Sequence, residues 1–190
     1  MSLPLNDKIC HALHSQLLII DMQERLASAM PAKVLNKVIE NNNVLLKAAN
    51  ELGIPVIHSE QYPRGLGATL PELSENLTGA NQSFTKTCFA CTEEDGFDEI
   101  ISKHKRQQII ISGIESHICV LQTALQLQHQ GYAVYVVEDA ICSRKKLNHK
   151  NAIARLQQSG VIISNVESVL FEWLRDTRHS SFKELSALIK

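Results

Sequence analysis

Five short apolar runs, rich in Ile, Val and Leu, recur along the chain with helical patterns between them. The runs cover Leu17–Asp21, Ile54–Glu60, Gln107–Ser112, Tyr132–Glu138 and Val161–Ser164. Within each run the apolar residues are adjacent rather than alternating, which is typical of strands buried on both faces. Strands of this kind that alternate with helices form a parallel sheet with helices on both sides. The sequence therefore predicts a doubly wound α/β domain.

Helical patterns fill the intervals between these runs. The longest one, KVLNKVIENNNVLLKAANEL, places its apolar residues at helical spacing, and Gly53 follows it as a helix-ending residue. Shorter helical patterns cover residues 94–105, 116–130 and 147–159, two more end the chain, and residues 81–87 have a weak strand pattern. We expect a single three-layer domain over residues 1–190, with a core at about 15–175, a helical extension to 190 and a mainly parallel sheet of about six strands in Rossmann-like order.

Composition limits the classes of partner. The formal net charge is −1, which gives no electrostatic argument for binding nucleic acid or a membrane surface. No apolar run is long enough for a membrane helix, and the first residues lack the pattern of a signal peptide. The five cysteines are sparse and odd in number, so we interpret them as free thiols and expect a cytoplasmic protein.

The predicted fold indicates where chemistry takes place. In open parallel sheets, ligands bind at the carboxyl ends of the strands, where the strand order reverses. The polar or reactive positions that follow the predicted strands are Asp21, Glu60, Gln61, Lys86, the turn from Gly113 to Cys119, and Asp139. For Asp139 a helix-capping or turn role is the preferred interpretation.

Cys119 follows the strand Gln107–Ser112 in the sequence GIESHICV. A helix that begins near Ser116 would place Cys119 in its first turn, where backbone N–H groups and the helix dipole lower the pKa of a thiol. The same N–H groups could bind an oxyanion. The spacing fits a buried apolar cysteine equally well. A serine nucleophile at Ser116 beside His117 is disfavoured, because adjacent helical residues do not face each other.

Asp21 and Lys86 are the other two candidates for a catalytic group. A carboxylate at the end of a buried strand is costly unless it is paired or used, so Asp21 could accept the proton of Cys119. A buried Lys86 beside it would favour the ionised acid and help the thiolate. The alternatives are a helix cap for Asp21 and a solvated surface position for Lys86.

Together, LLIIDMQERL, SFTKTCF and ISGIESHICVLQTALQLQHQGYAVYVVEDA resemble the isochorismatase-like cysteine hydrolase family, from about Leu17 to Val169. HSEQYPRGLGATLPEL and DAICSR are similar to the branch of isochorismatase domain-containing proteins. The resemblance implies a catalytic triad of Asp21 as base, Lys86 as charged partner and Cys119 as nucleophile. It also implies a cis peptide between Ile114 and Glu115, and an oxyanion hole made by the backbone N–H groups of Glu115 and Cys119.

Two departures from the family narrow the expected reaction. The nicotinamidase-type branch has a metal site of Asp and His residues after its second strand, whereas this chain has His58, Glu60 and Gln61 there, so we predict no catalytic metal and no cofactor. Isochorismatases that cleave a vinyl ether lack the nucleophilic cysteine. Cys119 therefore favours hydrolysis of a small amide or ester through a thioester intermediate, with C–N bonds other than peptide bonds as the expected target.

The remaining expectations concern substrate and assembly. The predicted substrate-binding residues are Gln23, Glu60, Gln61, Tyr62, Ile114 and His117. The expected partner is a small-molecule substrate, and the family resemblance implies further copies of the chain in a homo-oligomer. Two other functions stay open: a catalytically idle binding or scaffold protein, and a thiol redox protein that uses Cys88 and Cys91.

Overall fold

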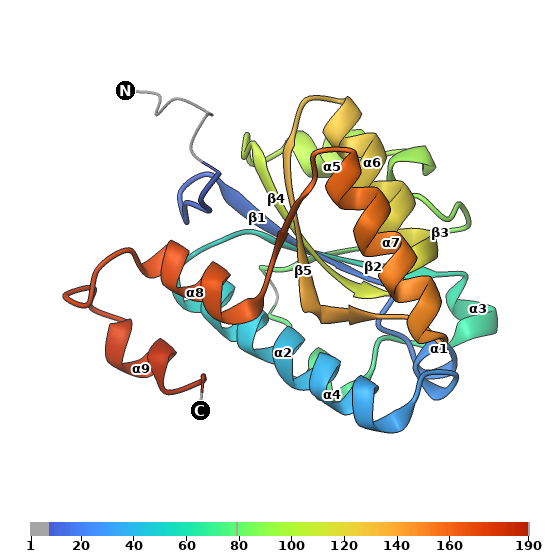
Figure 1. Cartoon of the computed structure of the whole chain (residues 1–190), viewed down its shortest axis with the longest axis horizontal. Coiled ribbons are helices and arrows are strands. Elements are labelled where there is room, and N and C mark those ends of the chain that lie inside the picture. The colour runs from blue at the N-terminus through green and yellow to red at the C-terminus, as the bar shows by residue number, and fades with distance from the viewer. Residues whose placement is uncertain (1–7, 79, 190) are drawn as a thin grey trace.

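The computed structural model describes residues 8–78 and 80–189. Within them, six parallel strands form one sheet in the order β3-β2-β1-β4-β5-β6 (Figure 1). The strands are β1 (Ser15–Ile20), β2 (Val56–Gln61), β3 (Gln82–Lys86), β4 (Gln108–Ile114), β5 (Ala133–Cys142) and β6 (Ile162–Ser164). The predicted α/β class and the parallel sheet are confirmed, and the weak pattern at residues 81–87 is the edge strand β3.

Helices cover both faces of the sheet (Figure 1). They are α1 (Glu24–Ser28), α2 (Ala32–Glu51), α3 (Pro63–Leu66), α4 (Pro71–Ser74), α5 (Phe97–Ser102), α6 (Leu121–His129), α7 (Lys146–Gln158), α8 (Val166–Leu174) and α9 (Phe182–Ser186). A 3₁₀ turn covers Cys91–Glu93, and a π-helical turn covers Ser116–Val120. No helix among the described residues is long and apolar enough to cross a membrane.

The central strand β1 shows why two cores form. Successive side chains of a strand point to opposite faces of the sheet. Leu17 and Ile19 pack in one core with residues of α2 and α8, whereas Leu18 and Ile20 pack in the other with residues of α5, α6 and α7. The unbroken apolar run of β1 therefore serves both layers, as strands buried on both faces require.

The strand order reverses at β1. From β1 the chain builds β2 and β3 on one side of the sheet, and then returns to build β4, β5 and β6 on the other side. The crevice at the carboxyl ends of β1 and β4 is the usual ligand position in such sheets. Asp21 follows β1 directly, and the turn with Cys119 follows β4.

Three local features of the structure differ from the sequence analysis or add to it. The loop after β2 contains the short helices α3 and α4, each of which begins at a proline, a residue suited to the first helical position. Strand β5 continues to Cys142, so Asp139 lies within it rather than at its end. The turn at Ser116 is π-helical, and Glu115 instead of Ser116 occupies the capping position.

Candidate active site

A buried ion pair lies at the centre of the site. Lys86 Nζ is 2.7 Å from Asp21 Oδ2, and both side chains are fully buried. Asp21 stands at the end of β1 with a φ of 50°, and Lys86 ends β3, on the far side of β2. The lysine side chain therefore reaches across the end of β2 to the carboxylate. The alternative that Lys86 is a solvated surface lysine is therefore wrong.

The Lys86 ammonium is fully surrounded by acceptors. Besides Asp21, it donates to Gln61 Oε1 at 2.6 Å and to the backbone oxygens of Cys88 and Phe89 at 3.2 and 3.1 Å. Burial alone lowers the pKa of Lys86, but the neighbouring Asp21 carboxylate raises it, and the net shift is upward. The Asp21 carboxylate therefore favours the charged form of Lys86 despite its burial.

Ser59 holds the second oxygen of the Asp21 carboxylate. Its hydroxyl donates to Asp21 Oδ1 at 2.6 Å, and the Asp21 backbone N–H donates to Ser59 O at 3.2 Å. The sequence analysis missed Ser59. The available signal was a buried serine next to the carboxyl end of β2, in register with Ile20 of β1.

Cys119 is buried beside Asp21 and Lys86. Burial, followed by the charge of Asp21, raises the pKa of the Cys119 thiol to about 12, and the Lys86 cation offsets only part of this shift. The predicted lowering of this pKa by the helix start is therefore wrong. In the resting site Cys119 is a neutral thiol next to a carboxylate that can accept its proton.

The turn before Cys119 is held by the segment after β5. The peptide bond between Ile114 and Glu115 is cis. The buried Glu115 carboxylate accepts hydrogen bonds from the backbone N–H of Arg144 at 2.9 Å and from its Nε at 3.2 Å. Arg144, which the sequence analysis did not select, therefore anchors the turn through Glu115.

Histidine contacts fix the same turn from the side of α7. His117 Nδ1 lies 3.0 Å from Ser143 Oγ, and Nε2 lies 3.1 Å from Asn148 Nδ2. Because an amide nitrogen can only donate, His117 Nε2 accepts this bond. Ser116 Oγ is 3.0 Å from His149 Nδ1. These contacts occupy both ring nitrogens of His117. The side chain that was predicted to bind substrate is therefore fixed by protein groups.

Two predicted substrate-binding glutamines connect the loops around the site. The Gln23 amide donates to the backbone oxygens of Gln61 and Gly67 at 3.0 and 2.7 Å and accepts from the Gln61 backbone N–H at 2.7 Å. The Gln61 amide binds Lys86 and Thr87 O. Both side chains are buried. Their hydrogen bonds hold the loops around the site in place.

The other predicted substrate-binding residues have different surroundings. Glu60 accepts two hydrogen bonds from Thr69, at 2.7 and 2.8 Å, and closes the loop after β2. Ile114 is fully buried. Tyr62 is 55% exposed and directly follows β2, which makes it the predicted residue with the most surface available to a ligand.

The C-x-x-C pair lies close to the site without a disulfide bond. Cys88 and Cys91 are both free thiols. Cys91 is buried, and its Sγ is 4.0 Å from Ser59 Oγ, whereas Cys88 is partly exposed. Burial raises the pKa of Cys91 to about 12. Among residues 8–78 and 80–189, no group of three or more His, Cys, Asp or Glu side chains is placed to hold a metal ion.

Comparison with known proteins identifies the family. The Isochorismatase domain family matches residues 15–168. Isochorismatase domain-containing protein 1 of Danio rerio is 39% identical over 90% of this chain, which spans only 59% of that protein. The solved structure described as MAR1 ribonuclease from Caenorhabditis elegans is 35% identical, with a TM-score of 0.88 over 95% of this chain and 92% of that one. The YcaC gene product of Escherichia coli, described as an octameric hydrolase of unknown specificity, shares the fold at 22% identity, with a TM-score of 0.88 over 99% and 91% of the two chains. This chain therefore belongs to the isochorismatase family and has its hydrolase fold.

Proposed function

We propose that the protein is a cysteine hydrolase that cleaves a small amide, ester or related bond through a thioester on Cys119. The observation that carries the proposal is the buried Asp21–Lys86 pair beside a neutral, buried thiol. A fully buried ion pair is a costly arrangement that stability alone does not favour. Its position at the strand-order reversal supports a catalytic use.

The first step forms a C–S bond between Cys119 and the substrate. Asp21 accepts the Cys119 proton as the sulfur attacks the carbonyl carbon, and the carbonyl electron pair moves to oxygen. Backbone N–H groups of Glu115 and Cys119 stabilise the resulting oxyanion. The raised pKa of Cys119 fits proton transfer during attack rather than a preformed thiolate. Lys86 and Ser59 keep the two carboxylate oxygens in place.

The second step releases the products. The oxyanion collapses, the C–N or C–O bond breaks, and the leaving group departs with the proton held by Asp21. Water then gives a proton to Asp21 and attacks the thioester carbon. When this intermediate collapses, the acid is released and the Cys119 sulfur recovers its proton from Asp21. Each residue returns to its starting protonation state, so no cofactor enters the cycle.

Substrate size, location and assembly form part of the proposal. The buried reacting groups favour a small molecule, with the exposed ring of Tyr62 available at the rim of the site. The free thiols, Cys119 included, suit the reducing cytoplasm. The octameric description of the YcaC structure supports assembly of this chain into a homo-oligomer.

RNA cleavage is the second candidate activity, because a structure 35% identical to this chain is described as a ribonuclease. The net charge of −1 argues against strong binding of a polyanion. A site built on a neutral thiol and a carboxylate also fits acyl transfer better than phosphodiester cleavage. Both activities can be measured on the same set of variants.

The test combines turnover with trapping of the intermediate. Wild type, Cys119→Ala and the matched control Cys88→Ala are assayed on a panel of small amides and esters and on single-stranded RNA. We expect hydrolysis of a panel member by wild type and Cys88→Ala only, with an acyl adduct on the Cys119 peptide in mass spectra of quenched reactions. Full turnover by Cys119→Ala would exclude covalent catalysis. RNA cleavage that survives Cys119→Ala would replace this function with the second candidate.

A further inference from the structure

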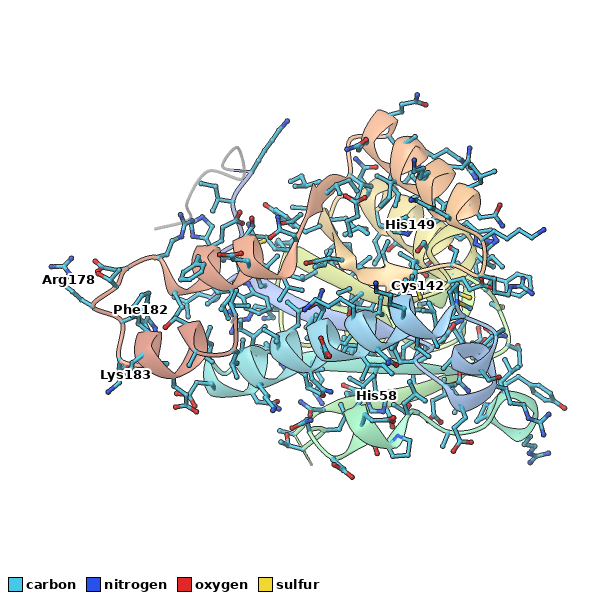
Figure 2. The ribbon with its side chains drawn as sticks, turned by 60° about the horizontal axis from the view of Figure 1, so that its bottom comes forward. His58, Cys142, His149, Arg178, Phe182 and Lys183 are labelled. Atoms are coloured by element: carbon cyan, nitrogen blue, oxygen red, sulfur yellow. The ribbon has the colours of Figure 1, made fainter. Side chains whose placement is uncertain are left out.

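Four of the five cysteines are buried, and the sheet divides these four into two pairs. Cys91 and Cys119 pack in the core on the side covered by α5, α6 and α7. Cys10 and Cys142 pack in the core on the opposite side, and Cys142, labelled in Figure 2, ends β5. Cys91 is therefore the buried thiol that lies on the same side of the sheet as the candidate nucleophile.

Two contacts fix Cys91 against the groups that surround Cys119. The Cys91 backbone N–H donates to Thr123 Oγ1 at 3.0 Å, and Thr123 comes four residues after Cys119, on the same side of a helical segment. The Cys91 Sγ lies 4.0 Å from Ser59 Oγ, whose hydroxyl donates to Asp21 Oδ1 at 2.6 Å. The Cys119 thiol lies within hydrogen-bonding reach of the same carboxylate. Both thiols therefore adjoin one buried group, the Asp21 carboxylate with its serine.

The other cysteine of the C-x-x-C pair faces a different environment. Cys88 is partly exposed, and its Sγ lies 3.4 Å from Glu93 O. Cys91 is fully buried, and its Sγ contacts Ser59 inside the site. A disulfide bond requires two sulfurs that are directed at each other, with Cβ atoms about 3.5–4.5 Å apart. The contacts of the two sulfurs therefore favour Cys119 over Cys88 as the partner of Cys91.

We propose that Cys91 is a resolving thiol for Cys119, and that hydrogen peroxide converts the two into a disulfide bond that switches the site off. Cys119 is 6% exposed, whereas Cys91 is fully buried, so peroxide reaches Cys119 first. Both residues are free thiols in the structure, which is therefore the reduced form of the pair. Formation of the bond does not require the proposed hydrolysis, because it uses only the two thiols and the peroxide.

The oxidation proceeds in two steps. The Cys119 sulfur attacks one oxygen of hydrogen peroxide, the O–O bond breaks, and a sulfenic acid and one molecule of water form. The Cys91 sulfur then attacks the sulfenic sulfur, the S–O bond breaks, and the oxygen leaves as a second molecule of water with the proton of Cys91. The two thiols lose two electrons in total, and the peroxide is reduced to two molecules of water.

A disulfide at this position has two consequences for the site. It removes the sulfur of Cys119 from reaction, and it prevents further oxidation to sulfinic acid, which thiols do not reverse. Burial raises the pKa of both thiols to about 12, so the pair reacts slowly and needs a high concentration of peroxide. Disulfides that form in the cytosol are usually transient and redox-sensing, which fits a reversible switch.

The first experiment maps the bond in the wild-type protein. After treatment with hydrogen peroxide, the remaining thiols are blocked with iodoacetamide in urea, and a non-reducing digest is analysed by mass spectrometry. We expect two peptides joined through Cys91 and Cys119, with the bond located by fragmentation. The control variants Cys88→Ala and Cys142→Ala should form the same bond. A bond between Cys88 and Cys91, or a Cys91 thiol that stays reduced at every peroxide concentration, would overturn the proposal.

The second experiment measures whether Cys91 makes the oxidation of Cys119 reversible. Wild type, Cys142→Ala and Cys91→Ser are treated with excess hydrogen peroxide and then with dithiothreitol, and the reduced fraction of Cys119 is measured with iodoacetamide in urea. We expect nearly full recovery in wild type and Cys142→Ala, and a lasting loss in Cys91→Ser, where the sulfenic acid oxidises further. Equal recovery in Cys91→Ser would mean that Cys91 does not protect Cys119.

Both experiments separate this inference from the proposed function. Neither readout needs a substrate, so a protein that hydrolyses no amide or ester can still form the bond between Cys91 and Cys119. Circular dichroism before treatment shows whether Cys91→Ser is folded. If this variant does not fold, the mapping of the wild-type protein decides the question alone.

Discussion

Asp21 and Asp139 are both acidic residues near the carboxyl edge of the same sheet, yet their surroundings differ. Asp21 is fully buried, with Lys86 Nζ at 2.7 Å from one oxygen and the Ser59 hydroxyl at 2.6 Å from the other. Asp139 is exposed, and its Oδ1 accepts a hydrogen bond from the Val166 backbone N–H at the start of α8. One acid is held by a cation inside the protein, and the other caps a helix.

This difference shows what turns an acid near the carboxyl edge of the sheet into a candidate base. Both residues lie near the carboxyl ends of strands, so this position alone does not explain the difference between them. Asp21 has a buried cation and a nearby thiol, whereas Asp139 has solvent and a backbone N–H. The comparison therefore predicts large effects on chemistry from changes at Asp21, and effects confined to stability from changes at Asp139.

Replacement of the two acids by their amides gives the largest contrast. Asp21→Asn removes the group that accepts the thiol proton, so we expect turnover to fall by about 10²–10⁴-fold, the usual contribution of a general base. Asp139→Asn should leave kcat and KM unchanged. Steady-state kinetics on a substrate from the panel checks both. Equal losses in the two variants would remove the distinction between them.

Removal of the Lys86 cation tests whether each charge of the buried pair needs the other for the stability of the fold. Lys86→Met leaves a buried carboxylate without its partner, which costs about 3–5 kcal/mol of unfolding free energy. In Lys86→Met/Asp21→Asn the charge is gone, so we expect most of this stability to return while turnover stays lost. Urea unfolding at constant m-value compares the wild type with the two variants. A Lys86→Met protein as stable as wild type would show that the pair contributes nothing to folding.

The reactivity of Cys119 gives the next effect in size. With a pKa of about 12, its thiolate fraction rises about tenfold for each pH unit between pH 7 and 10, and alkylation by iodoacetamide should rise in parallel. Asp21→Asn removes a negative charge that raises this pKa, so alkylation at pH 8 should be at least about tenfold faster, while Asp139→Asn should match wild type. Peptide mass spectrometry follows the label. A wild-type rate that levels off below pH 8 would mean an activated thiolate.

The fold was predictable because its signal is local and repeated. Each strand is a continuous apolar run, and strands that alternate with helices leave few arrangements other than a parallel sheet. The order of Asp21, Lys86 and Cys119 along the chain could also be read directly. Their meeting in space follows from the topology, since Lys86 ends an edge strand two positions from β1.

What the sequence could not provide is the environment of these groups. The helix start before Cys119 indicated a lowered pKa, but burial and Asp21 dominate and raise it. Ser59 was missed because a serine in a strand gives no sign of its neighbours until the register of β1 and β2 is known. Arg144 was missed for the same reason, since its bond to Glu115 joins segments 29 residues apart.

Ser59→Ala should have a smaller effect than either change at the ion pair. It removes a hydrogen bond to a charged acceptor, worth about 1.5–3 kcal/mol, while the contact of Asp21 with Lys86 remains. We expect reduced kcat with little change in KM, because one of the two carboxylate oxygens loses the hydrogen bond that holds it in place. Ser83→Ala, an exposed serine on the neighbouring β3, serves as the control. If both variants have the same kcat as wild type, Ser59 has no part in positioning Asp21.

The smallest expected effect is at Asp139, and it completes the comparison. Asp139→Ala deletes the acceptor for the Val166 N–H, which costs about 0.5–2 kcal/mol for a group at a helix start. Asp139→Asn keeps an oxygen at this position and should lose less. Urea unfolding separates the two, and Cys119 alkylation should be the same in both. A change of alkylation rate in Asp139→Ala would mean that the start of α8 is coupled to the site, and the two acids would then act on one centre rather than in separate roles.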